Sequence, residues 1–444
     1  MNRFSDRPIS IKLVLPMVSF LAMVPSLVFG QERLSLNDVV REGLVNNYSI
    51  QVSKNETMMS SRNVSYGNAG FLPSVSAYGS LDKASYDSQV KVVSGAELDT
   101  DNAKATVTTA GLKAEWILFD GARMFAEYDK LKTSWRISDL ETRVTMENVV
   151  YKIIIAYSDI IRHTVLLDAC AQRLKSSNLR YSIAHNKFKT GLGSEQEWLQ
   201  SGVARQADST SYIRQLSSLK KSKIALNELM CTNVQRDYTT DDTIPLVSIP
   251  ELDELITSSK QFNNELRINT EHLIYGKQEV KSLQSGRYPK LSLSGSYGFY
   301  ENDTEAAFIK FNRYYGPQIG LSLGMKLFDG LRLNKSIQNA KTKVQNRELL
   351  QKDMELQISA IVAQTYLDYK SQLLTISLGK EGLKLAEKNN EIAMKAYKSG
   401  MISSLDLRVA QEDLYQAKSS LANASFDAKI SETDLLRVSG MLIK

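Results

Sequence analysis

The segments "WILFDGARM" (residues 116–124) and "MKLFDGLRL" (residues 325–333) share the tetrapeptide Leu-Phe-Asp-Gly. A shift of 209 residues superimposes the two tetrapeptides and aligns the sequence after them without a gap for about 110 residues. Within this alignment "FKTG" (residues 188–191) falls on "YKSG" (residues 397–400). The tetrapeptide therefore belongs to a duplicated structural unit.

The sequence before the tetrapeptide also repeats, but at a shift of 216 residues. "GFLPSVSAYGS" (residues 70–80) matches "GRYPKLSLSGS" (residues 286–296), and the pair Asn46–Asn47 matches Asn263–Asn264 with one residue of slippage. Because the two shifts differ, a loop of variable length is expected between each proline and the tetrapeptide. Each repeat is predicted to contain a helix, two strands around a loop, and a pair of long helices.

Apolar and polar residues alternate with a period of two after each proline and before each tetrapeptide. Before the second tetrapeptide, Ile319, Leu321 and Leu323 alternate with Ser322 and Gly324. This period predicts β-strands that have one apolar and one mostly polar face, in an outer-membrane barrel or, alternatively, in a soluble β-sandwich. The predicted strands cover about residues 73–84, 106–119, 290–301 and 316–328.

After each tetrapeptide the apolar period changes to steps of three and four residues. Ile153, Tyr157 and Ile160 follow these steps, and Val362 and Tyr366 repeat them 209 residues later. Such spacing predicts a coiled-coil seam. The predicted elements are long helices over residues 121–189 and 330–398, and partner helices over residues 195–231 and 404–440. A long helix of this kind would span about 100 Å, far more than a globular domain needs.

The first thirty residues differ from the rest, because basic residues precede an apolar run that is interrupted by prolines. This arrangement predicts a secretory signal peptide over residues 1–30; the alternative is an uncleaved membrane anchor. No later stretch is apolar for about eighteen residues, so insertion into a membrane is expected to use strands. The mature chain then divides into repeat 1 (31–231), a linker (232–250) and repeat 2 (251–444).

Composition and motifs argue against several classes of function. The 55 Lys and Arg residues alternate with 49 Asp and Glu residues along the chain, which is typical of a solvated surface and not of a nucleic-acid site. His163, His185 and His272 lie far apart and form no metal-ligand spacing. No catalytic triad, phosphate loop or CxxC pattern occurs. We therefore predict a protein without enzymatic activity, metal or cofactor.

Four strands are too few to close a barrel, since the smallest single-chain barrels use about eight and open edges are not tolerated in lipid. Strands must then be pooled between copies of the chain. Two copies would give a barrel that side chains nearly fill, whereas three would leave room for water. An exported, non-conducting coiled-coil adaptor or adhesin stalk remains the alternative, because the long heptads alone would suffice for it.

The chain resembles the TolC family of outer-membrane efflux proteins. The resemblance rests on "LSLNDVVREGLVNN" (residues 34–47), on the two proline segments and the two tetrapeptides, and on "YKSGMISSLDLRVAQEDLYQAKSSLANA" (residues 397–424). It implies an α+β membrane protein: a homotrimer in which a twelve-stranded β-barrel, with four strands per protomer, is continued by a twelve-helix periplasmic α-barrel of coiled-coil helices. It also implies that residues 232–250 belong to an equatorial belt around this tunnel.

The resemblance further implies a passive exit duct in the outer membrane of a Gram-negative bacterium. The expected partners are outer-membrane lipid, a periplasmic adaptor protein and an inner-membrane pump of the RND or ABC type. Drug efflux, type I protein secretion and metal export all use this fold, so the cargo stays open.

Family proteins close the tunnel at the turn between each long helix and its partner. By resemblance, the periplasmic gate would consist of Asp406, Glu197 and Tyr397, with three-fold rings of carboxylates that favour cations. The alternative for the two acids is an ordinary place at a helix N-terminus, where the dipole favours them. The best-known member has a second aspartate where this chain has Val409 and an arginine where it has Ile402, so fewer salt bridges are expected.

By the same comparison, the turns expected to contact the adaptor contain Gly191, Gly193, Gly400 and Ser403; the alternative is that any helical hairpin ends in Gly and Ser. The joints and the faces of the strands are expected from the residue patterns. The expected joints between strand and helix contain Asp120, Gly121, Asp329 and Gly330, where each Asp can cap the following helix and each Gly permits a turn. Lys113, Glu115 and Lys326 are expected to face the lumen. Trp116, Leu118, Leu293, Leu323 and Met325 are expected to face lipid.

Overall fold

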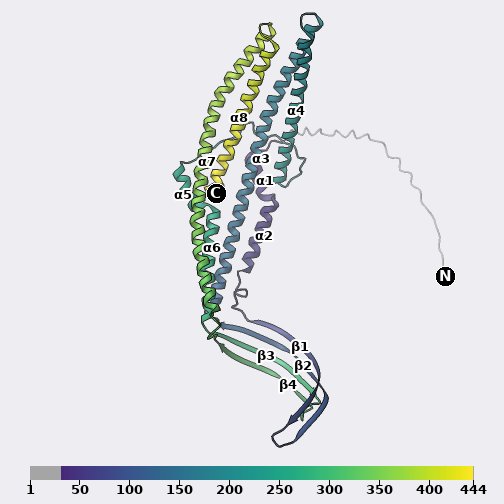
Figure 1. Ribbon diagram of the computed structural model, residues 1–444, viewed down its shortest axis with the longest axis vertical. Helices are drawn as coiled ribbons and strands as arrows, with labels where there is room; N and C mark the ends of the chain where they lie inside the picture. The colour runs from purple at the N-terminus through teal and green to yellow at the C-terminus, as the bar shows by residue number, and fades with distance from the viewer. Residues whose placement is uncertain (1–31, 444) are drawn as a thin grey trace, which may run out of the picture.

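The computed structural model describes residues 32–443, so the predicted signal peptide lies outside the described residues. The molecule is elongated, with a curved four-stranded sheet at one end and two long helical hairpins at the other (Figure 1). Within residues 32–443, no helix combines the length and the apolar character needed to cross a membrane.

The helical part contains two related sets of helices. The first set is α1 (Leu36–Asn46), α2 (Tyr48–Asn63), α3 (Arg123–Lys189) and α4 (Glu195–Leu229), and the second is α5 (Leu252–Phe262), α6 (Asn264–Gln284), α7 (Arg332–Lys398) and α8 (Ser404–Val438). Helices α3 and α7 have 67 residues each. The segment before each pair of strands, predicted as one helix, is two helices, because the chain is extended at Asn47 and at Asn263.

These two asparagines have matching roles. Each accepts a hydrogen bond from the first turn of the helix that follows it, and each side-chain amide donates to the last turn of a partner helix, at Leu229 O for Asn47 and at Val438 O for Asn263, both at 2.9 Å. The structural repeat therefore pairs Asn47 with Asn263 at the shift of 216. The one-residue slippage inferred from the sequence is wrong.

The sheet is antiparallel, in the order β1-β2-β3-β4. Its strands are β1 (Ser74–Lys91), β2 (Glu97–Phe119), β3 (Lys290–Thr304) and β4 (Phe311–Gly324). The region expected to be a loop of variable length in repeat 1 is strand instead, because residues 85–91 pair with residues 97–104 and extend the hairpin. The hairpin turn then needs only residues 92–96, in which Gly95 has a φ of 89°.

Strand β4 ends at Gly324, four residues before the predicted end of residue 328. Gly324 pairs with Lys290, the first residue of β3, which directly follows Pro289. Since proline has no backbone N–H, β3 cannot continue the ladder in that direction. Met325 and Lys326 therefore lie beyond the strand, and the alternation that predicted their faces does not apply to them.

Helices α3 and α4 pack against each other, as do α7 and α8, and α3 also packs against α6 and α8. Each repeat has its own apolar cluster. The first includes Ile153, Tyr157, Ile160 and Leu226, and the second contains the residues 209 positions later, Val362, Tyr366, Tyr369 and Leu435. The duplicated sequence therefore builds two equivalent cores on the long helices.

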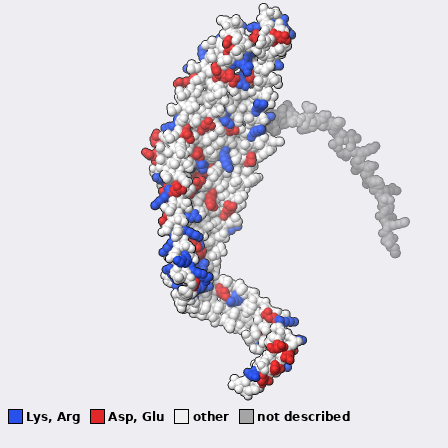
Figure 2. Space-filling model, viewed as in Figure 1, with Lys and Arg blue, Asp and Glu red and all other residues white. Residues whose placement is uncertain are grey.

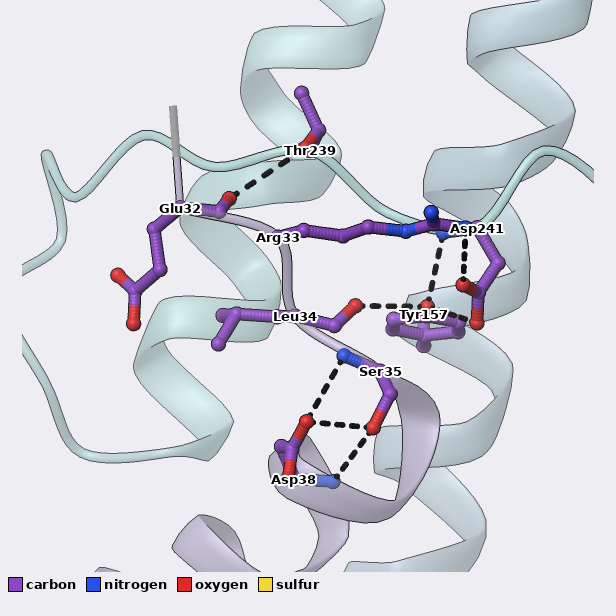
Figure 3. A network of polar contacts seen from close by, with 8 residues as sticks. All are labelled: Glu32, Arg33, Leu34, Ser35, Asp38, Tyr157, Thr239 and Asp241. Carbon is purple, nitrogen blue, oxygen red and sulfur yellow. Dashed lines mark hydrogen bonds and ion pairs between the residues drawn. The ribbon is translucent and has the colours of Figure 1, made fainter. Parts of the chain in front are cut away.

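The segment between the repeats is tied to the start of the described chain (Figure 3). The single proton of the Tyr157 hydroxyl is shared between Leu34 O (2.9 Å) and the Asp241 carboxylate (2.8 Å), and the hydroxyl oxygen accepts from Asp241 N (3.1 Å). The Arg33 guanidinium lies 3.0 Å from the same carboxylate. Tyr157 is fully buried, and this burial raises its pKa to about 12, so the hydroxyl keeps its proton at neutral pH.

Candidate functional site

The joints between sheet and helix are capped by the aspartates of the repeated tetrapeptide. The Asp120 carboxylate accepts a hydrogen bond from Met124 N at 3.1 Å, and the Asp329 carboxylate accepts one from Leu333 N at 3.0 Å. Each bond satisfies a backbone donor that the first turn of a helix leaves unpaired. The caps fix where α3 and α7 begin.

The backbone of each joint turns sharply. Gly121 and Ala122 have φ values of 73° and 67°, and Gly330 and Leu331 have values of 69° and 64°. At Gly121 the glycine is also required by space, because an added Cβ would collide with the carbonyl oxygen of Ser285. The sequence indicated the glycine but not the second left-handed residue, since alanine and leucine rarely adopt this conformation.

One face of the sheet is polar. Residues that pair directly on antiparallel strands point to the same face, so the register assigns each residue to a row. Two adjacent rows near the joint carry most of the polar side chains, and Lys113 forms an ion pair with Glu115 between them. The rows are Ser74–Glu115–Ser294–Gly320 and Ser76–Lys113–Ser296–Gln318.

The opposite face is apolar near the joint. Its rows include Trp116–Leu293–Leu321 and Leu112–Tyr297. A shift in register between Ile117 and Phe119 leaves Leu118 out of the ladder, so Phe119, and not Leu118, pairs with Leu291 in the row of Leu323.

At the far end of the molecule, tight turns join α3 to α4 and α7 to α8. Gly191 and Gly400 have φ values of 71° and 76° and end the long helices. A Cβ on Gly193 would lie 2.8 Å from the Cβ of Lys187, so this glycine is needed for close approach. Ser194 and Ser403 accept hydrogen bonds from the backbone of the partner helices and cap them.

Asp406 lies in a capping box with Ser403. Its carboxylate accepts from Ser403 Oγ (2.7 Å) and Ser403 N (3.0 Å), while Asp406 N donates to Ser403 Oγ (3.2 Å). The hydrogen bond from the Ser403 hydroxyl is the main reason that the pKa of Asp406 is lowered. Asp406 is exposed, so it presents a stable negative charge to solvent at neutral pH.

Tyr397 is buried in the tip between the two hairpins, with only 2% of its surface exposed. It packs with Leu407 of α8 in a cluster that also contacts Ile183 of α3 and Ile402 of the turn, and the Lys187 ammonium lies 5.5 Å from the centre of its ring. Burial raises the pKa of Tyr397, and the carboxylate of Glu197 adds to the effect. The charge of Glu197 thus lies near enough to act on Tyr397, but among the described residues no hydrogen bond joins the two side chains, and Asp406 is engaged with Ser403.

Polar contacts of Arg173 also join the two hairpins, and none of the residues involved was predicted from the sequence. Arg173 of α3 forms ion pairs with Asp208 of α4 (2.9 Å) and Glu412 of α8 (3.2 Å), and its guanidinium lies 4.3 Å from the centre of the Tyr415 ring. Arg180 lies two turns further along α3 and is 4% exposed. Its guanidinium donates a hydrogen bond to Ser177 Oγ (2.8 Å). No sequence pattern signals these contacts, because the charged partners lie on other helices and look like ordinary surface residues.

Charges are mixed over the helices, whereas the sheet near the joint shows few of them (Figure 2). The Lys113–Glu115 ion pair belongs to this part of the sheet. Acidic residues gather at the hairpin end of the sheet, which includes Asp99, Asp101, Asp303 and Glu305.

A sheet with one apolar and one polar face, joined end-on to paired helices of 67 residues, defines a protomer of an outer-membrane channel. Residues 39–232 and 273–441 match the model of the outer membrane efflux protein family. The chain belongs to this family, so it is an efflux channel protein of the outer membrane in Gram-negative bacteria. The predicted fold class is confirmed.

Solved channels share the fold at low sequence identity. The outer-membrane channel OprN aligns with a TM-score of 0.74 and 16% identity, over 91% of this chain and 89% of that one. The CmeC outer membrane channel of Campylobacter jejuni aligns with a TM-score of 0.75 and 16% identity, over 92% and 86%. The outer membrane protein VceC of Vibrio cholerae aligns with a TM-score of 0.72 and 17% identity, over 91% and 96%.

Proposed function

We propose that three copies of this chain form the passive exit duct of a tripartite efflux pump or a type I secretion system. One observation carries this proposal: within residues 32–443, neither β1 nor β4 has a second partner strand. An open sheet edge in lipid leaves backbone groups without hydrogen bonds, at a cost of several kcal/mol each. Pairing β4 of one protomer with β1 of the next removes every edge and gives a closed ring of twelve antiparallel strands.

The helices support the same assembly. Helix α7 exposes a series of leucine side chains, each 67–72% exposed in the single chain. They are Leu356, Leu367, Leu374, Leu378 and Leu385. Helix α4, at the other side of the protomer, exposes Leu199, Val203 and Ile213. Exposed apolar surface of this extent is typical of an interaction site. We assign it to contact between α7 of one protomer and α4 of its neighbour in a twelve-helix tunnel.

The helix tips are the proposed periplasmic gate and docking site. Tyr397, which is buried in a cluster with Ile183 of α3, would hold the two hairpins of one protomer together. Glu197 and Asp406 would add carboxylates near the tip, three of each in the trimer. The adaptor protein would contact the turns that contain Gly191, Gly193, Gly400 and Ser403. Leu192 and Met401 are 82% and 77% exposed in these turns, which supports an apolar contact there. An RND or ABC pump in the inner membrane would complete the system.

The assembly is tested by placing charge on the proposed interface. Leu374→Glu combined with Leu378→Glu should leave a monomer in detergent, as measured by light scattering after size exclusion, and should abolish channels in planar bilayers. Lys380→Glu, on the same helix at a residue that is already charged and exposed, is the matched control and should remain trimeric. A wild-type chain that is a freely soluble monomer, or that gives no channels, would rule out the duct and favour a non-conducting stalk.

A further inference from the structure

The side chain of Tyr78, on the edge strand β1, lies across the polar face of the sheet. Tyr78 pairs with Gly111 of β2, which pairs with Gly298 of β3, which pairs with Gly316 of β4. The row therefore consists of one tyrosine and three glycines. Tyr78 is 45% exposed, so one side of its ring remains open to solvent.

The glycines provide the space that the tyrosine occupies. A Cβ on Gly111 would lie 2.9 Å from the Tyr78 hydroxyl oxygen, and a Cβ on Gly298 would lie 2.7 Å from it. The hydroxyl thus reaches past β2 as far as β3, and the ring leans along the sheet, away from the free edge of β1. Any larger residue at Gly298 must displace it.

Polar groups surround the ring on the joint side. A depression of about 430 Å³ on this face is lined by Tyr78, Lys113, Ser294, Ser296, Gln318 and Gly320. On the other side, one row away, the rings of Tyr300 and Tyr314 stack with centres 4.7 Å apart and planes inclined by 17°. Aromatic faces and hydrogen-bonding groups thus lie side by side on the polar face.

We propose that Tyr78 and its glycine floor, Gly111 and Gly298, form a solute-contacting site in the lumen of the barrel. The flat ring receives the planar apolar part of a passing solute. Ser296, Gln318 and Lys113, whose ammonium also pairs with Glu115, bind its polar or anionic part. Because the Tyr78 ring lies against these glycines, its position also determines the width of the lumen at this level. This inference rests on the proposed duct, because only a closed barrel turns the polar face into a lumen.

Three variants test the seating in planar bilayers. Gly298→Ala displaces the Tyr78 ring from the surface of the sheet into the lumen and should lower the single-channel conductance. Tyr78→Ala combined with Gly298→Ala should restore it, because no side chain is left to swing inward. Gly295→Ala adds the same methyl group to β3 but on the apolar face, where a Cβ meets no atom within 4 Å, so it controls for the substitution itself and should conduct like the wild type. Equal conductance of Gly298→Ala and the wild type would overturn the clearance role.

The contact role is tested with 2-naphthoate, a planar aromatic anion, as a blocker of the open channel. Tyr78→Phe should keep the wild-type block, because it retains the ring, and Tyr78→Ala should lose it. Block that is equal in all three proteins would overturn the site. If the wild type forms no channel at all, the proposed duct fails instead, so the two failures are distinguishable.

Discussion

Tyr157 and Tyr366 occupy equivalent positions on α3 and α7, and each donates a hydrogen bond to a carboxylate of the connecting region, Asp241 in the middle of the segment between the repeats and Glu251 directly after it. The Tyr157 hydroxyl donates to Asp241 at 2.8 Å, and the Tyr366 hydroxyl donates to Glu251 at 2.7 Å. The duplicated tyrosines therefore fasten one connecting segment to both long helices. This arrangement explains how a segment with little regular structure keeps a fixed path across two helical hairpins.

Replacing Tyr157 by Phe should lower the free energy of unfolding by about 1–3 kcal/mol, because the buried hydroxyl shares its proton between Leu34 O and Asp241 and accepts from Asp241 N, and the change leaves these groups without that partner. Tyr366→Phe should cost less, since its hydroxyl bonds to an acid that is exposed. Denaturant unfolding of the protein in detergent measures both. Equal losses for the two variants would contradict the difference in burial.

Asp120→Ala and Asp329→Ala should each destabilise the start of a long helix by about 0.5–2 kcal/mol, the usual cost of a lost cap. Faster hydrogen exchange at the amides of Met124 and Leu333, which donate to these aspartates, is the direct readout. Asp129→Ala, which removes an exposed acid in the second turn of α3, is the control and should leave both amides protected. Unchanged exchange in the Asp120 variant would show that the joint does not need its cap.

Asp406→Ala should weaken block of the channel by multivalent cations, because it removes one carboxylate per protomer from the proposed ring. Bilayer recordings with added divalent or trivalent cations measure this effect. Asp413→Ala, an exposed acid two turns further along α8, controls for the change in net charge and should preserve the block. If the Asp406 variant conducts and blocks like the wild type, Asp406 acts only as a helix cap.

Tyr397→Ala should open the tip. The side chain is 2% exposed and packs between α7, α8 and α3, so its removal leaves a cavity that costs about 3–5 kcal/mol where the hairpins meet. Higher conductance in bilayers and increased protease cleavage at the turns are expected. Tyr397→Phe retains the packing and should stay closed, and an open channel in that variant would assign the closure to the hydroxyl instead.

Stability should fall as the pH drops below about 6.5 because of His163. Burial lowers the pKa of this histidine in the folded protein, against a smaller opposing effect of Asp159. Between the folded-state pKa and the ordinary value, the unfolded chain binds a proton that the folded chain does not, so acid favours unfolding. His163→Gln should flatten the dependence of the melting temperature on pH. His272 has a pKa lowered by burial as well, so the double variant should flatten it further.

The sequence by itself determined the fold class. Three local patterns carried this prediction: the duplicated tetrapeptide, the change in apolar spacing from two residues to three and four, and the glycines in the turns. Each predicts a strand, a helix or the end of a helix from residues that are near one another in the chain. The fold class follows from these elements, because four strands with an apolar face need partners. The same local logic identified Asp120 and Asp329 as caps.

The tertiary structure decided the features that depend on residues far apart in the sequence. The end of β4 at Gly324 depends on Pro289, and the match of Asn47 with Asn263 depends on where α4 and α8 end. The burial of Tyr397 against Ile183 depends on how two hairpins pack. The seat of Tyr78 needs glycines from two other strands. None of these partners can be read from a local period, since each contact requires the packed sheet and helices to bring distant segments within a few ångströms.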